Sequence, residues 1–196
     1  MKLQADRATI WRIAYPIMLT GIAQNIVGIT DTAFLGRYSN VALGAVGVAS
    51  IWFWVFAVFA YSLGSGLQIM VARCLGEDDN NAVGRLMRIG FILSGILGVG
   101  LAVLLWWVTP PAVYALFQSD AIAAASVDYL QARAPEVFWA FIFQVLRGFY
   151  SGLGRTRILG WASGIQAAVN VVLDYALIFG RLGLPEMGVA GAGLAS

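Results

Sequence analysis

Histidine is absent from this sequence, and cysteine occurs once, at Cys74. A single cysteine cannot form a disulfide within the chain, and the common zinc sites are built from clusters of cysteine and histidine. A zinc-protease helix and a Ser-His triad each need a histidine as well. These shortages exclude a disulfide scaffold and the best-known hydrolases, and we expect a protein that is not an enzyme.

Charged residues are also scarce. They make up 11% of the chain, whereas soluble domains carry about 25%. The net charge is +2, and no basic cluster resembles a nucleic-acid footprint, so no nucleic-acid partner is expected. Hydrophobic residues account for 60% of the chain. With so little polar surface, the chain is expected to have the lipid bilayer as its solvent.

Long apolar runs take the place of the missing charges. About 20 apolar residues span the bilayer core as a helix, and these runs do not alternate as the strands of a membrane barrel do. The sequence therefore predicts an all-α integral membrane protein with five complete transmembrane helices and the start of a sixth. The predicted helices cover residues 10–35, 43–72, 89–108, 135–153 (after a polar lead-in from Ala121) and 158–179, with the sixth starting at 188–196.

The basic residues set the orientation, because cytoplasmic loops of membrane proteins carry an excess of lysine and arginine. Nine of these residues lie on one predicted side, before or at the start of the first helix, between the second and third helices, or at the end of the fourth helix and after it: Lys2, Arg7, Arg12, Arg73, Arg85, Arg88, Arg147, Arg155 and Arg157. The other side has Arg37 and Arg181. We expect a multi-pass protein of the plasma (inner) membrane with a cytoplasmic N-terminus.

Two carboxylates, Asp31 and Asp174, lie inside apolar runs. An acid in a membrane helix costs at least about 2.5–3.5 kcal/mol on insertion scales, and it is functional by default. At 1.5 Å per residue, both acids are expected roughly 7–9 Å below the outer ends of their helices. Asn170 precedes Asp174 by four residues and shares its helix face. The two acids can therefore meet if their helices are neighbours.

Two close carboxylates in lipid cannot both ionise cheaply, so one of them is expected to hold a proton near neutral pH. The oxygens of Asp31, Asn170 and Asp174 could instead bind Na⁺. The sequence leaves both ions open, and a polar cluster that only fixes helix packing is the alternative.

Four further residues are candidates for supporting roles. Gln24, Thr30 and Tyr175 are candidate cavity-lining residues beside the acids. Pro16 lies within the first helix, where a proline removes a backbone hydrogen bond and bends the helix. A bend there could be coupled to protonation of Asp31, or it could be a static kink. Arg133, which stands near Asp128 and Glu136, is interpreted as part of an ion pair in a helical extension above the membrane, with a substrate role as the alternative.

Several segments, taken in order, resemble a known transporter family. They are Ala-Tyr-Pro-Ile at 14–17, Thr-Asp-Thr-Ala-Phe-Leu-Gly at 30–36, Gly-Ser-Gly-Leu-Gln at 64–68, Val-Ala-Arg-Cys-Leu-Gly-Glu at 71–77, 170–180 and the glycine-rich run 188–196. Together they are similar to the N-terminal half of a MATE (multidrug and toxic compound extrusion) transporter of the DinF-like branch. The resemblance covers essentially the whole chain.

The resemblance implies a fold of two helical lobes around a central cavity. It implies secondary active efflux of small organic, often cationic, compounds in exchange for H⁺ or Na⁺, without a cofactor. Pro16 and Asp31 match the family's proline and aspartate in the first helix, and Asn170 and Asp174 match the pair in the fifth helix. Ser196 keeps the hydroxyl of a family threonine in the sixth helix. In the family, protonation of the first-helix aspartate is linked to bending at the proline.

Two departures from the family pattern limit this expectation. Residues 154–157 read Gly-Arg-Thr-Arg where relatives commonly have an Asp-Thr pair. Residues 1–196 also correspond to the N-terminal lobe alone, so the C-terminal lobe is an expected partner, because alternating access needs two halves. A lipid-linked oligosaccharide flippase of the same superfamily and a non-transporting membrane fragment are the alternatives.

Overall fold

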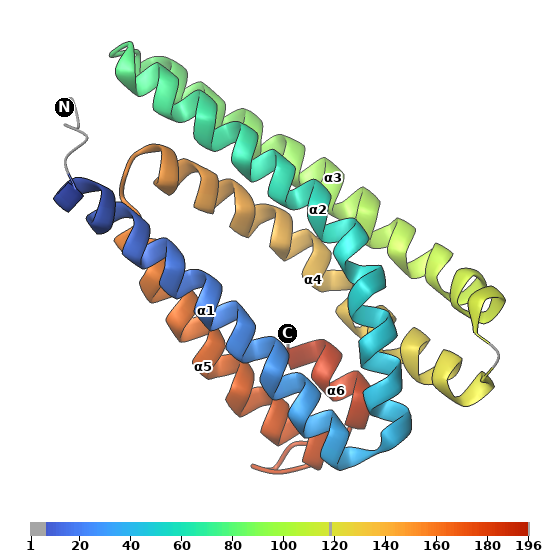
Figure 1. The fold of residues 1–196 in the computed structure, drawn as a ribbon. Helices are drawn as coiled ribbons and strands as arrows, with labels where there is room; N and C mark the ends of the chain where they lie inside the picture. Colours follow the sequence, from blue (N-terminus) through green and yellow to red (C-terminus); the bar gives the residue numbers. More distant parts are fainter. Residues whose placement is uncertain (1–6, 118, 196) are drawn as a thin grey trace.

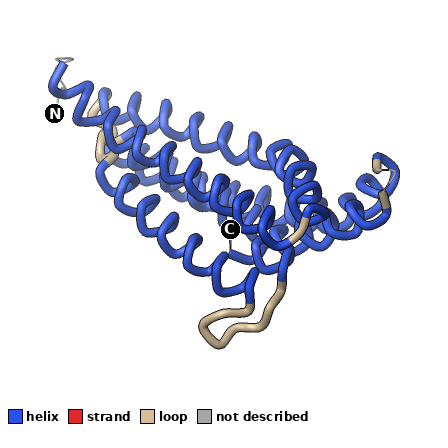
Figure 2. The backbone as a smooth tube through the Cα atoms, turned by 60° about the horizontal axis from the view of Figure 1, so that its bottom comes forward, coloured by secondary structure: helices blue, strands red, loops and turns tan. Residues whose placement is uncertain are grey.

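The structure, a computed structural model, describes residues 7–117 and 119–195, and it contains six helices within them. The helices are α1 (Arg7–Tyr38), α2 (Asn40–Gly76), α3 (Asn80–Leu116), α4 (Asp120–Gly152), α5 (Arg157–Phe179) and α6 (Gly188–Ala195). No strand occurs in the described residues, and Figure 2 shows short connections between most helices and a longer loop between α5 and α6. The predicted all-α fold is confirmed.

Several helices are longer than the apolar runs that predicted them. Helix α3 begins at Asn80 rather than near residue 89, and it continues to Leu116 through Pro110 and Pro111. Helix α4 begins at Asp120 rather than near residue 135, so Pro135 lies inside it. Hydropathy marks the part of a helix that suits lipid, whereas backbone hydrogen bonding continues into the polar flanks.

Polar side chains and a glycine set the helix ends. The Ser39 hydroxyl accepts a hydrogen bond from the Ala42 amide (2.9 Å) at the start of α2, and Asp79 Oδ1 accepts one from the Ala82 amide (2.8 Å) at the start of α3. Such caps satisfy amides that lack a partner in the first helical turn. Helix α5 ends at Gly180, where φ is +63°, a conformation that glycine adopts without a steric penalty.

The helices form two groups (Figure 1). Helix α1 packs along α5, whereas α2 and α3 pack against α4, and α6 packs on both α4 and α5. The start of α1, the α2–α3 turn and the α4–α5 turn lie at one end of the bundle, at the upper left of Figure 1. The helices therefore alternate in direction, as expected for a chain that crosses a bilayer repeatedly.

The main core lies where α2, α3 and α4 meet. Leu105, Leu130 and Phe141 are fully buried there. By contrast, large apolar side chains such as Ile96 and Trp107 of α3 are 65% and 74% exposed. Helices α2, α3 and α5 are long and apolar enough, by length and composition, to cross a membrane. A core on one face and apolar side chains on the other are typical of helices that face lipid.

Glycine lets α2 and α4 approach closely. A Cβ atom placed at Gly64 would lie 2.5 Å from the Gln144 carbonyl oxygen, and one at Gly148 would overlap the Gly64 carbonyl. Small residues at such crossings are a common device of membrane helices, whose association depends on close packing. Gly66, two residues after Gly64 on the same helix, has open space where a Cβ atom would lie.

We therefore expect Gly64→Ala to destabilise the folded protein by about 1–3 kcal/mol, because the added methyl forces α2 and α4 apart. The measurement is the thermal unfolding midpoint of the purified protein in detergent. Gly66→Ala is the matched control on the same helix and should leave the midpoint within error or raise it slightly. Equal midpoints for the two variants would contradict close packing at Gly64.

Candidate functional site

The carboxyl groups of Asp31 and Asp174 meet between α1 and α5. Asp31 is 5% exposed and Asp174 is fully buried. Their carboxyl groups lie close enough to interact electrostatically. The two acids are far apart in the sequence, and they lie near each other because α1 and α5 pack along each other.

A hydrogen bond between two carboxyl groups requires a proton on one of them, because an ionised carboxylate only accepts. A direct hydrogen bond between Asp31 and Asp174 would therefore require one proton on the pair. Full ionisation would place two like charges against each other in a buried site, which is costly. The arrangement thus favours a site whose proton can be exchanged.

Asn170 extends the site toward α6. Its amide nitrogen donates a hydrogen bond to the Ala195 carbonyl oxygen (3.1 Å). This bond fixes the side chain, and no donor within residues 7–117 and 119–195 reaches Asn170 Oδ1 or either oxygen of Asp174. The site therefore offers several buried oxygen acceptors, which suit a proton or a hard cation. The fourth predicted residue, Ser196, lies outside the described residues.

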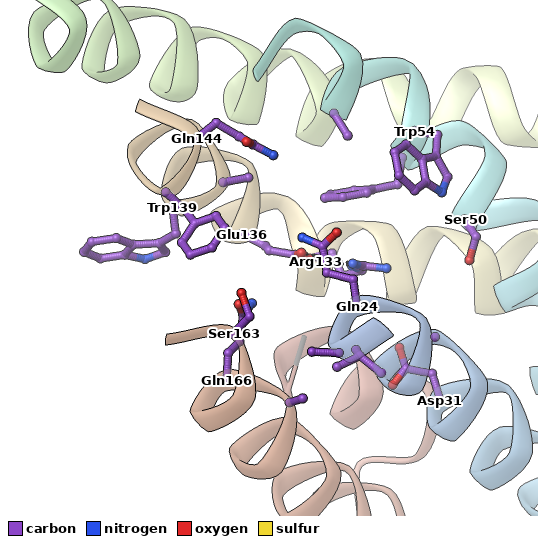
Figure 3. A pocket seen from close by; sticks show the side chains of 18 of the residues that line it. Gln24, Asp31, Ser50, Trp54, Arg133, Glu136, Trp139, Gln144, Ser163 and Gln166 are labelled. Carbon is purple, nitrogen blue, oxygen red and sulfur yellow. Dashed lines mark hydrogen bonds and ion pairs between the residues drawn. The ribbon is translucent and has the colours of Figure 1, made fainter. Parts of the chain in front are cut away.

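A cavity of about 610 Å³ lies between α1, α2, α4 and α5 (Figure 3). Asp31 is part of the cavity lining, whereas Asp174 and Asn170 are not. Asp31 is therefore the residue that connects the buried acid pair with the cavity.

Aromatic and amide side chains make up much of the cavity wall. Trp54 and Tyr61 of α2 stack with ring centroids 5.9 Å apart, and the Tyr61 hydroxyl donates to Gln24 Oε1 (3.3 Å). Trp139 and Gln166 line other sides of the cavity. A cavity of this size with aromatic walls and a few polar groups is typical of small-molecule sites.

Of the three candidate lining residues, Gln24 lies in the cavity wall, but Thr30 and Tyr175 do not. The Thr30 hydroxyl donates to the Ile26 carbonyl of its own helix (2.8 Å). Tyr175 is 47% exposed, and its ring packs against Phe34 and Phe179. Thr30 and Tyr175 are each adjacent in sequence to one of the two acids. The rotation of each helix nevertheless directs their side chains away from the cavity.

Pro16 is buried in α1, near the end that carries the N-terminus. It lies against α5, where a Cβ atom placed at Gly160 would be 3.4 Å from the Pro16 ring. The Thr20 hydroxyl donates to the Pro16 carbonyl oxygen (3.0 Å). The proline thus sits at the same α1–α5 interface as the acid pair.

Arg133 and Glu136 form an ion pair, as the sequence predicted. Arg133 Nε and Nη2 lie 2.5 and 3.0 Å from the two Glu136 carboxylate oxygens. Both residues line the cavity. The i, i+3 spacing of Arg133 and Glu136, with Tyr129 one turn earlier, was the available signal for a charged helix face.

Ser163 is a further polar residue that the sequence analysis did not select. It is 2% exposed and lines the cavity, and its hydroxyl has no partner within the described part of the chain. Ser163, Ala167, Asn170 and Asp174 are the buried residues along one face of α5. Their spacing of three and four residues is the signal that could have identified Ser163.

Comparison with known proteins gives consistent matches. The MatE family profile matches residues 16–176. "Probable multidrug resistance protein NorM" of Rhizobium meliloti is 31% identical over 97% of this chain and 40% of its own length. "Multidrug resistance protein PmpM" of Pseudomonas aeruginosa is 31% identical over 100% of this chain and 41% of its own. The chain thus spans about 40% of the length of the curated relatives it matches.

A solved structure shows the same helical arrangement. The outward-facing conformation of a multidrug resistance MATE family transporter superposes with a TM-score of 0.85 at 25% identity. The match covers 95% of this chain and 41% of that one. The described helices therefore correspond to one lobe of such a structure.

The stability of Asp174→Asn distinguishes an ion site from a structural polar cluster. An asparagine keeps the shape and can hydrogen-bond Asp31, but it removes one acid from the buried pair. We expect the folded protein to become more stable by about 1 kcal/mol or more, because a buried charge site is costly to maintain. The measurement is the thermal unfolding midpoint at pH 8 in detergent.

The matched control is Asp128→Asn, which makes the same chemical change at an exposed position of α4. It should not change the midpoint. A large loss of stability in Asp174→Asn would show that the acid pair acts as packing glue.

Proposed function

The chain belongs to the MATE family of multi-pass membrane transporters, and we propose that it is the N-terminal lobe of a secondary active transporter that exports organic compounds in exchange for H⁺ or Na⁺. The family is one of transporters and not of enzymes. The DinF-like branch inferred from the motifs is consistent with that membership.

The proposal is carried by one observation: Asp31 belongs both to the buried acid pair and to the wall of the cavity. A coupling ion bound between Asp31 and Asp174 and a cationic compound in the cavity would both draw on the Asp31 carboxylate. Ion and cargo would then disfavour each other, which is the thermodynamic requirement of an exchanger.

The acid pair supports either coupling ion. The proximity of Asp31 and Asp174 supports a proton, because two like charges in a buried site repel each other unless one acid is protonated. The acceptor oxygens of Asp174 and Asn170 favour Na⁺ as the alternative, with Ser196 as a further ligand.

The distribution of arginine supports a cytoplasmic N-terminus in the inner membrane. Arg73, Arg85 and Arg88 near the α2–α3 turn are exposed, as are Arg155 and Arg157 at the α4–α5 turn. Both turns lie at the end of the bundle where α1 begins (Figure 1). This is the charge asymmetry that orients membrane proteins.

The proposal places a C-terminal lobe opposite this one as a partner, because relatives are longer than this chain and alternating access requires two halves. A flippase for lipid-linked oligosaccharides is less well supported. Arg133, the cation among the described lining residues, is neutralised by Glu136, so the cavity lacks the excess positive charge that a purely anionic cargo needs.

The transport test uses cells that express the complete open reading frame containing this sequence. Asp31→Asn and Asp174→Asn should each abolish efflux of cationic dyes, by at least tenfold in initial rate, while the protein is still inserted in the membrane. Asp128→Asn, on the exposed face of α4, is the control and should keep wild-type efflux. Unchanged dye resistance in both acid variants would refute the proposal.

Pro16→Ala tests the coupling of helix bending to the acid pair. Alanine restores the backbone N–H donor that proline lacks, and it favours a straight helix at this position. We expect a several-fold slower efflux with unchanged equilibrium dye binding, because the cavity residues are not altered. Rates and binding are measured in proteoliposomes and detergent, respectively, and an equal loss of both would indicate misfolding instead.

A further inference from the structure

We propose that Arg133 binds a carboxylate group of the cargo, so that the cavity selects compounds carrying both an anionic group and a cationic aromatic body. The inference rests on the proposed function, because it takes this cavity as the cargo site. It adds a recognition group on α4 that faces the acid of α1 across the cavity, as Figure 3 shows for Arg133 and Asp31.

Arg133 is held rigidly in the wall. Its Nε and Nη2 donate to the two oxygens of Glu136, and its Nη1 donates to the Tyr129 hydroxyl (2.7 Å). The guanidinium carbon lies 4.2 Å from the centroid of the Phe53 ring. A guanidinium fixed by three hydrogen bonds and an aromatic face is preorganised, so little conformational entropy is lost when a ligand binds it.

The guanidinium retains donors for a ligand. It has five N–H groups, and three of them are used by Glu136 and Tyr129 within the described residues. One N–H remains on each terminal nitrogen. The side chain is 14% exposed and lines the cavity, so a carboxylate in the cavity can accept from these donors through short, charge-assisted hydrogen bonds.

The charge balance argues for a zwitterion over a simple anion. Glu136 already neutralises Arg133, and Asp31 adds a further acidic group to the cavity wall. A purely anionic cargo would therefore face a net negative wall. A cargo with a carboxylate near Arg133 and a cationic group near Asp31 or Glu136 satisfies both signs.

The rest of the cavity fits an aromatic body between the two charges. Phe53, Trp54 and Trp139 line it, and its volume of about 610 Å³ lies in the range of drug-sized sites. Aromatic faces attract organic cations and exclude water. The cavity thus provides an anion donor, an acid and aromatic walls within one space.

The test is equilibrium binding of two matched dyes to the purified full-length protein in nanodiscs, followed by fluorescence polarisation. Rhodamine B carries a cationic xanthene and a free carboxylate, and its ethyl ester has the same body without the negative charge. The wild type should bind the acid about tenfold or more tightly than the ester, the change expected for charge-assisted hydrogen bonds. A ratio near one in the wild type overturns the inference without any variant.

The variant is the double substitution Arg133→Gln with Glu136→Gln, which removes both partners and leaves no unpaired buried charge. It should bring the acid-to-ester ratio close to one while the ester still binds. Arg133→Lys keeps the charge but loses the planar donors, and it should weaken acid binding only. Arg181→Gln, in the exposed loop after α5, is the control and should keep the wild-type ratio.

The outcomes separate the two proposals. Equal binding of both dyes by the wild type, or an unchanged acid preference in the double variant, overturns the carboxylate site and leaves the antiporter proposal intact. Binding of neither dye, together with absent efflux, overturns the cargo cavity itself and the carboxylate site with it.

Discussion

The burial of two acids between α1 and α5 is the constraint on which the lobe depends. A carboxylate in lipid needs a partner or a proton, and Asp31 and Asp174 lie close to each other. Their contact fixes the height of α1 relative to α5, and the Asn170 hydrogen bond ties α6 to the same place. The proline of α1 lies at this interface too, so a change at the acids and a change in the shape of α1 act on the same surface.

The second group of helices provides a frame against which that pair can act. Gly64 and Gly148 bring α2 and α4 so close that no side chain fits between their backbones, and the core of α2, α3 and α4 is fully buried. Contact between α4 and α5 is slight by comparison, and the cavity lies between the two groups. The division into two packed groups is what leaves a site large enough for a small molecule beside Asp31.

The ion pair of Arg133 and Glu136 adds charged groups to the cavity wall. It places both signs of charge in a wall that is otherwise aromatic and amide. An arginine in this setting is stabilised by its carboxylate and by the faces of Phe53 and Tyr129. The same contacts that make its burial tolerable also hold it in place, and that rigidity suits recognition of a ligand.

The sequence by itself determined the all-α membrane class, the order of the helices and the two intramembrane acids, because apolar length and a charge within an apolar run have a direct meaning in lipid. Counting residues along straight helices predicted an equal depth for Asp31 and Asp174. Only the tertiary structure decided that α1 and α5 are neighbours, that Thr30 and Tyr175 point away from the cavity, and that Arg133 points into it. The physical reason is that helices which are apolar all round carry no sequence signal for their rotation, so close packing of backbones and side chains sets which face meets the cavity.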